Sequence, residues 1–320
     1  MRTTLSAVSI GVSFACACQL ASGQTVTVTQ QGYGNTSSAE QVGTVTTDPA
    51  IPMMESTATI IQIGDNNHVG GPGASGSGIF QRDNHNGGAS AVVEQYGSGN
   101  NASITQDNTS SAHGSVDATI TQRGILNDAT IRQFLMTTSP ATVEQNGIGN
   151  VARVEQLNSS DTGIRATQNG NGNQLMIRQY DGVYYGPEVT QNGDGNSAWI
   201  VSESSPAAGP VVVQTGTLNS VLTFQTGGWD SSITVGQQGA SNRAEVNQFG
   251  EAHQASTDQN GSNNFVSVTQ GSTNWPIGGS TAQVAQLGNS NSAILRQYGD
   301  GYAARVNQTG AGNWSNVYQH

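Results

Sequence analysis

The chain has 320 residues and a formal net charge of −11, and it contains no lysine. Its hydrophobic fraction is 34% and its charged fraction is 10%, both well below the values of a typical globular domain. This composition argues against two domains with large apolar cores, and the acidic charge argues against a nucleic-acid partner. The remainder is dominated by 42 Gly, 30 Gln and 29 Asn. Gln- and Asn-rich chains with recurring β-branched residues are typical of stacked cross-β structures.

Residues 1–23 form the first predicted element, a secretory signal peptide. Arg2 provides a short positive region, residues 5–17 are apolar or small, and small residues precede a predicted cleavage site after Gly23. The apolar run is too short for a membrane span, and no second run follows it. The sequence therefore predicts an exported chain without a transmembrane segment.

Both cysteines lie inside this leader. Removal of Cys16 and Cys18 with the signal peptide would leave no disulfide, thiolate nucleophile or cysteine-based metal site. An alternative cleavage after Ala17 would leave Cys18 as a lipid-bearing N-terminus.

From residue 24 onwards, one motif recurs in twelve consecutive copies. A Gln is followed by Gly two residues later, by Asn at five residues and, in ten copies, by a second Gln at eleven residues. Copies in the middle of the chain are 23 residues apart. In the second and seventh copies, Gly73 and Ser202 stand where the second Gln is expected.

The motif defines three sets of candidate stacking residues and one set of turn glycines. The first Gln of the copies is Gln30, Gln62, Gln95, Gln122, Gln145, Gln168, Gln191, Gln214, Gln237, Gln259, Gln286 and Gln308. The Asn is Asn35, Asn67, Asn100, Asn127, Asn150, Asn173, Asn196, Asn219, Asn242, Asn264, Asn291 and Asn313. The second Gln is Gln41, Gln106, Gln133, Gln156, Gln179, Gln225, Gln248, Gln270, Gln297 and Gln319. The glycines are Gly32, Gly64, Gly97, Gly124, Gly147, Gly170, Gly193, Gly216, Gly239, Gly261, Gly288 and Gly310.

Each copy has the pattern of two short strands joined by a tight turn. Apolar and polar residues alternate before the first Gln, as in residues 141–144, and the alternation resumes after the Asn. This pattern places the three amides on the inward face together with Val, Ile, Leu and Ala. Thr, Ser, Glu and Arg face outward. The Gly between the strands supplies the positive φ of the turn.

Inward amides predict that the copies stack. An unsatisfied buried amide costs about 1–3 kcal/mol. That cost disappears if each Gln bonds the same Gln in the neighbouring rungs, about 4.7–4.8 Å away. The predicted fold class is therefore all-β, a β-solenoid of about twelve strand–turn–strand rungs that forms a single domain over residues 24–320. Loop insertions are expected near residues 42–57, 70–78, 107–117, 203–210 and 271–281.

Copies such as those beginning at Gln168 and Gln191 have the form Gln-x-Gly-x-Gly-Asn. This form resembles the curlin repeat of curli, a bacterial extracellular amyloid fibre, and the resemblance covers essentially all of the chain after the leader. It implies a secreted structural subunit that polymerises into cross-β fibres for cell-surface adhesion and biofilm matrix, in a bacterium expected to be Gram-negative. It also implies two partners, a nucleating curlin-like subunit and an outer-membrane secretion apparatus.

Both ends of the predicted solenoid are open. The first strand begins directly after the predicted cleavage site, and the last rung runs to Gln319 and His320. Soluble solenoids cap their terminal rungs with polar or irregular elements. The uncapped edges therefore predict head-to-tail addition of further copies, so that the main partner of the chain is the chain itself. The acidic surface is expected to slow lateral clumping of the fibres.

The sequence predicts neither an enzyme nor a cofactor or metal site. Gly147, Gly149 and Ala152 formally match a dinucleotide fingerprint, but no helical pattern follows them. Asp–Gly pairs do not recur at a fixed offset, as a calcium-binding repeat requires, and no nucleophile elbow is present. The histidines have no metal-ligand spacing and are expected at the surface; they are His68, His85, His113, His253 and His320.

The sequence allows two interpretations both of its outward aromatic residues and of its overall function. Aromatic residues follow the second Gln in several copies and form either a hydrophobic clasp, which we favour, or an adhesive stripe; they are Phe134, Tyr180, Phe249 and Tyr298. The alternative to a polymer is a soluble monomeric β-solenoid that binds a surface, a glycan or ice. Variable outward residues such as Ile61 and Met176 count against a regular ice-binding array.

Overall fold

The computed structural model describes residues 4–5, 24–43, 56–70, 78–83, 88–108, 116–204, 209–227, 229–271 and 279–320. All regular elements within these ranges are β-strands. The chain divides into two compact units, unit 1 (Met1–Ile164) and unit 2 (Arg165–His320). The predicted signal peptide, apart from residues 4–5, and the central parts of the five predicted insertions lie outside the described residues.

Unit 1 contains two parallel sheets. Its strands are β1 (Thr4–Leu5), β2 (Gln24–Gln31), β3 (Thr36–Ser37), β4 (Ala39–Gly43), β5 (Ser56–Ile63), β6 (His68–Val69), β7 (Ile79–Asp83), β8 (Ala89–Ser98), β9 (Asn101–Asn108), β10 (Val116–Ile125), β11 (Asp128–Phe134), β12 (Ala141–Ile148) and β13 (Val151–Leu157). One sheet runs in the order β1-β2-β5-β8-β10-β12. In the other, β3 and β4 pair with β6 and β7, which precede β9, β11 and β13.

Unit 2 is built in the same way. Its strands are β14 (Ile164–Asn171), β15 (Gln174–Tyr180), β16 (Glu188–Asp194), β17 (Ser197–Glu203), β18 (Val211–Thr217), β19 (Ser220–Thr226), β20 (Ser232–Ala240), β21 (Arg243–Phe249), β22 (Gln254–Ser262), β23 (Phe265–Gly271), β24 (Thr281–Asn289), β25 (Ser292–Tyr298), β26 (Ala303–Ala311) and β27 (Trp314–Gln319). The even-numbered strands pair in parallel in sequence order, as do the odd-numbered strands.

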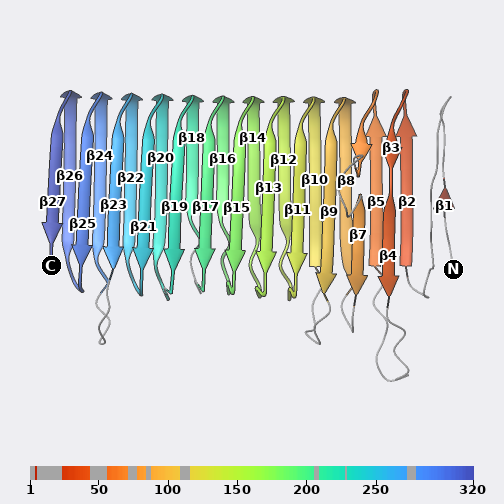
Figure 1. The fold of residues 1–320 in the computed structure, drawn as a ribbon, viewed down its shortest axis with the longest axis horizontal. Helices are drawn as coiled ribbons and strands as arrows, with labels where there is room; N and C mark the ends of the chain where they lie inside the picture. The colour runs from red at the N-terminus through yellow and green to blue at the C-terminus, as the bar shows by residue number, and fades with distance from the viewer. Residues whose placement is uncertain are drawn as a thin grey trace, which may run out of the picture. The chain divides into compact units, whose positions relative to one another are not determined.

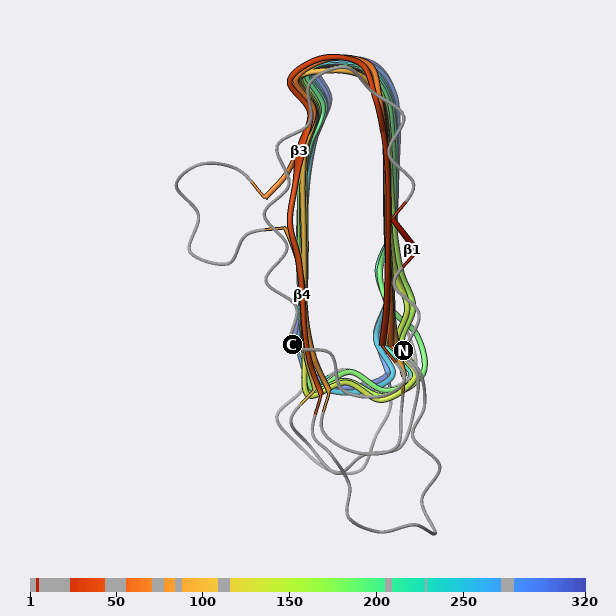
Figure 2. The same cartoon turned by 90° about the vertical axis from the view of Figure 1, so that its right-hand side faces the viewer.

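Each rung places one strand in each sheet, and successive rungs stack in register (Figure 1). Within unit 1, the two strands of a rung form the long sides of a flattened ring, with β3 and β4 opposite β1 (Figure 2). Parallel pairing between rungs follows from the repeat, because each copy presents the same alternation to the next copy. The predicted all-β solenoid is confirmed.

The inside of the ring is a narrow core of small and β-branched side chains. Buried and exposed residues alternate along the strands, as in β12 and β13. Ala141, Val143, Ala152 and Val154 are at most 1% exposed. Small residues suit this position because the two strands of a rung lie close together, and a large core is not needed when neighbouring rungs cover each face.

The number of regular rungs is smaller than predicted. About nine turns have two unbroken strands and buried inward side chains. In the first two copies, the second strand is divided into β3 and β4 or into β6 and β7. In the last copy, strands β26 and β27 bury only Val306 and Gln308. The prediction of about twelve equivalent rungs is therefore slightly too high, because an insertion and a terminal position disturb some copies.

The turn between the two strands requires glycine. In all twelve predicted turn glycines, φ lies between 107° and 130°. A Cβ atom on Gly193 would lie 2.0 Å from the carbonyl oxygen of Gly216 in the next rung. The rungs therefore approach too closely at this corner for any side chain.

Replacing Gly193 should destabilise the fold far more than replacing Gly172. Gly172 has a φ of 63°, and a Cβ there would meet nothing within 4 Å. Gly172→Ala should cost about 1 kcal/mol. Gly193→Ala should cost more than about 3 kcal/mol, since it adds backbone strain and a clash with the next rung. Denaturant unfolding of the two variants provides the measurement, and equal midpoints would contradict the proposed close approach.

Candidate functional site

The first Gln of each copy forms a continuous row of buried amides in each unit. In unit 1, Gln122 Nε2 donates to Gln145 Oε1 at 2.9 Å, and the same bond links the preceding Gln residues at 2.5 to 2.9 Å. In unit 2, the row runs from Gln168 to Gln308 with distances of 2.8 to 3.0 Å. Each amide donor points to the rung of higher residue number.

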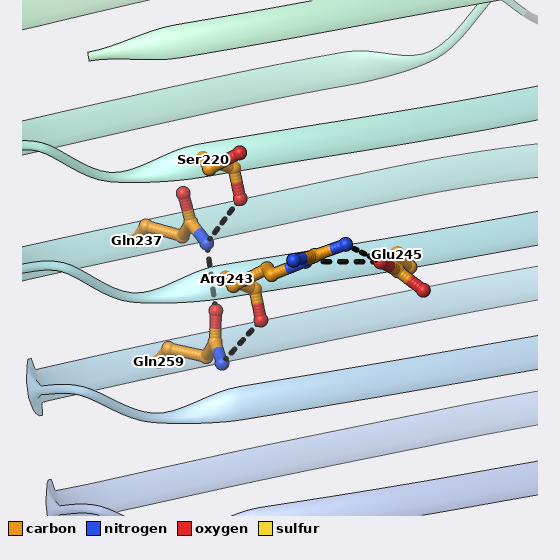
Figure 3. A network of polar contacts seen from close by, with 5 residues as sticks. All are labelled: Ser220, Gln237, Arg243, Glu245 and Gln259. Atoms are coloured by element: carbon orange, nitrogen blue, oxygen red, sulfur yellow. Dashed lines mark hydrogen bonds and ion pairs between the residues drawn. The ribbon is translucent and has the colours of Figure 1, made fainter.

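The same amides also join the two sheets. Gln237 Nε2 donates to Gln259 Oε1 at 2.8 Å and to the backbone oxygen of Ser220 at 3.1 Å. Gln259 Nε2 likewise bonds the backbone oxygen of Arg243 at 3.0 Å (Figure 3). On the outer face of β21, the side chains of Arg243 and Glu245 form an ion pair. A single Gln thus links its own rung, the next rung and the opposite sheet.

At the turn, the Asn residues form a second row, in which the donors of the Asn-to-Asn hydrogen bonds point to the rung of lower residue number. The backbone N and Nδ2 of Asn150 both donate to Asn127 Oδ1 at 3.1 Å. Asn127 Nδ2 also donates to the carbonyl oxygen of Gly147 at 3.0 Å. In unit 2, equivalent backbone-to-Oδ1 bonds run from Asn196 to Asn313. The Asn row therefore satisfies the turn backbone and fixes the glycine corner.

The second Gln forms a third row that includes a residue outside the predicted set. In the second copy, the offset of eleven residues from Gln62 falls on Gly73, which lies outside the described residues. Gln81 occupies the place, accepting from Gln41 at 2.7 Å and donating to Gln106 Oε1 at 2.9 Å. The strand pattern of Ile79 and Gln81 after the insertion was the signal that could have revealed it.

The third row is interrupted in unit 2. Ser202 replaces the second Gln between Gln179 and Gln225. The Ser202 hydroxyl and the Gln225 Oε1 atom are buried and make no hydrogen bond within the described residues. The neighbouring inward residue Thr223 is also fully buried, and its hydroxyl has no partner there. The row resumes from Gln248 onwards.

Most of the predicted amide residues are buried. Only Asn313 and Gln319, in the last copy, are half-buried, and the others are at most 7% exposed.

A further row, not expected from the sequence, lies where the chain enters each first strand, six residues before the first Gln. Ser139 Oγ accepts from the backbone N of Thr162, and Ser231 Oγ accepts from the backbone N of His253. Ser or Thr recurs six residues before the first Gln in several copies. This recurrence in the sequence could have revealed the row. In the rungs that carry a hydroxyl here, the row gives the entering strand of the next rung a side-chain acceptor.

His253 takes the place of a hydroxyl in this row. The prediction that all the histidines lie at the surface was wrong for His253, which is completely buried. Its Nδ1 accepts from the backbone N of Ser280 at 3.1 Å, so the neutral ring carries its proton on Nε2. Burial lowers the pKa of His253 below its ordinary value of 6.5, while Asp300 and the backbone of Phe249 oppose this shift. His85 and His113 lie outside the described residues.

Within the described ranges, no group of three or more His, Cys, Asp or Glu side chains is placed to hold a metal ion. Among the same residues, no helix is long and apolar enough to cross a membrane.

The aromatic residues that follow the second Gln lie on the outer face. Phe249 and Tyr298 are 41% and 44% exposed. Phe249 packs against Phe224, and Tyr298 packs against Tyr318, with ring centroids 5.7 and 5.8 Å apart. Each pair links neighbouring rungs from outside the ring.

The sequence model described as "Curlin associated repeat" matches residues 239–271. The chain carries a curlin repeat. The matched segment begins at a turn glycine, Gly239, and contains strands β21, β22 and β23. The resemblance to the curlin-repeat family is thereby confirmed, and the stacked parallel solenoid is compatible with a structural subunit of the curli kind. A search of curated proteins finds no match to the chain.

Restoring the missing amide should stabilise the interrupted rung of Ser202. Ser202→Gln would place a Gln between Gln179 and Gln225 and offer partners to the buried polar atoms. We expect a gain of about 1–2 kcal/mol in the free energy of unfolding. Ser197→Gln, an outward change in the same strand, serves as the control and should have almost no effect. A loss of stability in Ser202→Gln would show that the rung cannot hold the longer side chain.

The buried His253 should make unit 2 sensitive to acid. Because its folded-state pKa is lowered, the unfolded chain binds a proton first as the pH falls below about 6.5. The stabilisation is therefore complete above this pH and is lost as the pH falls through the folded-state pKa. His253→Ser restores the hydroxyl of other rungs and should unfold with a weaker pH dependence between pH 7 and pH 5. Parallel melting curves of the two proteins would contradict this assignment.

Proposed function

We propose that this chain is a secreted structural subunit that polymerises head to tail into curli-like cross-β fibres, which serve cell-surface adhesion and the biofilm matrix. The rows of the first Gln and of the Asn support this proposal, because within each unit they bond identical groups from rung to rung and contain no feature that limits their length.

The edge formed by β26 and β27 is the observation that carries the proposal. Within the described residues, β26 pairs only with β24, and β27 pairs only with β25. Gln308 Nε2, which in inner rungs would donate to the next Gln, turns instead to Ser315 Oγ at 3.3 Å. This rung therefore presents open backbone edges and an amide donor to an incoming copy.

The first rung offers the matching face. Gln30 donates forward to Gln62, so its own Oε1 faces the side from which a preceding rung would donate. The Asn row has the opposite direction, and Asn313 would accept where Asn35 of a following copy donates. Donors meet acceptors in both rows only when the β26–β27 edge of one copy contacts the β2 edge of the next copy. All subunits of a fibre would therefore have the same orientation.

The leader would control this face. Strand β1 pairs with β2 at Thr27 and Val28 and so covers part of its edge. Cleavage after Gly23, as the sequence predicts, would uncover β2. We further propose a nucleating curlin-like subunit and an outer-membrane secretion apparatus as partners, with the fibre at the surface of a Gram-negative bacterium.

Polymerisation is tested with the chain lacking its predicted signal peptide, released from denaturant. Thioflavin fluorescence should rise after a lag that preformed fibres abolish, and diffraction should appear at about 4.7 and 10 Å. A stable monomer that does not respond to seeds at high concentration would refute the proposal.

The amide rows should control the rate of assembly. Replacing Gln145, Asn150 and Gln156 together with Ala should slow fibre growth at least about tenfold, since each lost bond leaves a buried neighbour without its partner. The matched control replaces the outward residues Glu144, Arg153 and Glu155 with Ala. If the two triple variants grow at the same rate, the amides do not drive assembly.

A further inference from the structure

The outer face of four neighbouring strands in unit 2, β15, β17, β19 and β21, carries a cluster of large apolar side chains. In register, Met176 lies beside Trp199 and Trp199 beside Leu222, while Val201 lies beside Phe224. Trp199, Leu222 and Phe249 are 50%, 39% and 41% exposed. We call this cluster the Trp199 patch; it consists of Met176, Trp199, Val201, Leu222, Phe224 and Phe249.

The patch reverses the usual polarity of these strands. In β19, Leu222 and Phe224 face outward, whereas Thr223 between them is buried without a hydroxyl partner in the described residues. In β17, Val201 faces outward and Ser202 faces inward. Folding alone favours the opposite arrangement, with the apolar residues inside. The outward apolar residues therefore point to a use outside the rung.

Among the offsets of the patch residues, strands β9, β11 and β13 of unit 1 carry apolar residues only at that of Phe249, as Phe134 and Leu157. At the places equivalent to Trp199 and Leu222, strands β9, β11 and β13 carry Ser103, Thr130 and Arg153. Beyond the patch in unit 2, Leu222 is followed by Glu245. Exposed apolar patches of this kind mark interaction sites when they are confined and bordered by polar residues.

We propose that the Trp199 patch is the lateral contact between fibres, formed with the patch of a second copy of this chain. The inference rests on the proposed polymerisation. The chain has a net charge of −11, so two fibres repel each other over most of their surface. The patch itself contains no charged residue, and Arg178 and Glu203 beside it have opposite signs. Another stacked sheet also presents side chains at the same spacing of about 4.7–4.8 Å.

The size of the patch explains why it would act only in fibres. From its exposed fractions and the roughly 150–250 Å² of an aromatic side chain, the patch exposes about 400 Å² per copy. A pair would bury about 800 Å² in total, below the roughly 1,200–2,000 Å² of a stable complex. Single subunits should therefore remain unpaired. Along a fibre, one patch recurs in every subunit, and many weak contacts add together.

The test compares purified fibres of three proteins. The patch variant carries Trp199→Thr, Leu222→Thr and Phe224→Thr, since Thr keeps the β propensity of an outward position. The control variant carries Ile125→Thr and Ile148→Thr, two exposed aliphatic residues of unit 1 that lie outside the patch. Electron microscopy gives the fraction of fibres in bundles, and seeded thioflavin kinetics give the elongation rate.

We expect the patch variant to lose bundling at least about fivefold while its elongation rate stays within about twofold of the wild type. The control should bundle as the wild type does, and bundling of the wild type should rise with salt, because screening reduces the repulsion. Unchanged bundling of the patch variant, or wild-type fibres that never bundle, would overturn the proposal.

Two other outcomes are separable. If the wild type forms no fibres at all, the proposed function fails rather than the patch. If wild-type fibres associate only after a polysaccharide is added, the patch binds a glycan and the second-copy assignment is wrong. Should the triple variant fail to elongate, Trp199→Thr alone is examined, and failure of this variant as well would assign the patch to rung folding and overturn the lateral contact.

Discussion

Each buried amide in this protein needs a donor and an acceptor in neighbouring rungs, and the other features of the fold follow from that requirement. An isolated rung would leave the three amides without partners at about 1–3 kcal/mol for each group. Stacking in register removes this cost, and register in turn requires parallel strands of matched length. The same requirement explains the glycine at each turn. Asn127 reaches the carbonyl oxygen of Gly147 only because no Cβ atom separates the two rungs there.

Much of this architecture could be predicted from the sequence, because a repeat with period-two alternation determines both the strands and their inward faces. The alternation alone places the amides of Gln145 and Asn150 inside the rung. The sequence did not reveal Gln81, since an insertion shifted it away from its expected offset. It also misplaced His253, because a histidine in a connector offers no pattern that distinguishes a buried acceptor from a surface side chain.

The outer faces are where the sequence was least informative. An outward position accepts almost any side chain without cost to the rung, so the Trp199 patch appeared only as irregular variation. Its meaning depends on register, which brings Met176, Trp199 and Leu222 side by side although they are far apart in the chain. Inward rows support growth along the stack, whereas this outward cluster supports contact between fibres. In the proposed fibre, the two directions of assembly would thus be carried by separate faces of the same rungs.

The missing amide at Ser202 also has a mechanical consequence. A fibre under tension yields where the fewest bonds resist separation of neighbouring rungs, and in the proposed fibre Ser202 and Thr223 would leave such a place in every subunit. Load would therefore tend to open the rungs around Ser202, where only two of the three amide rows, those of the first Gln and of the Asn, hold neighbouring rungs together. On release, the Gln and Asn rows would guide these rungs back into register, so that a matrix built from this chain would stretch and recover instead of fracturing at random.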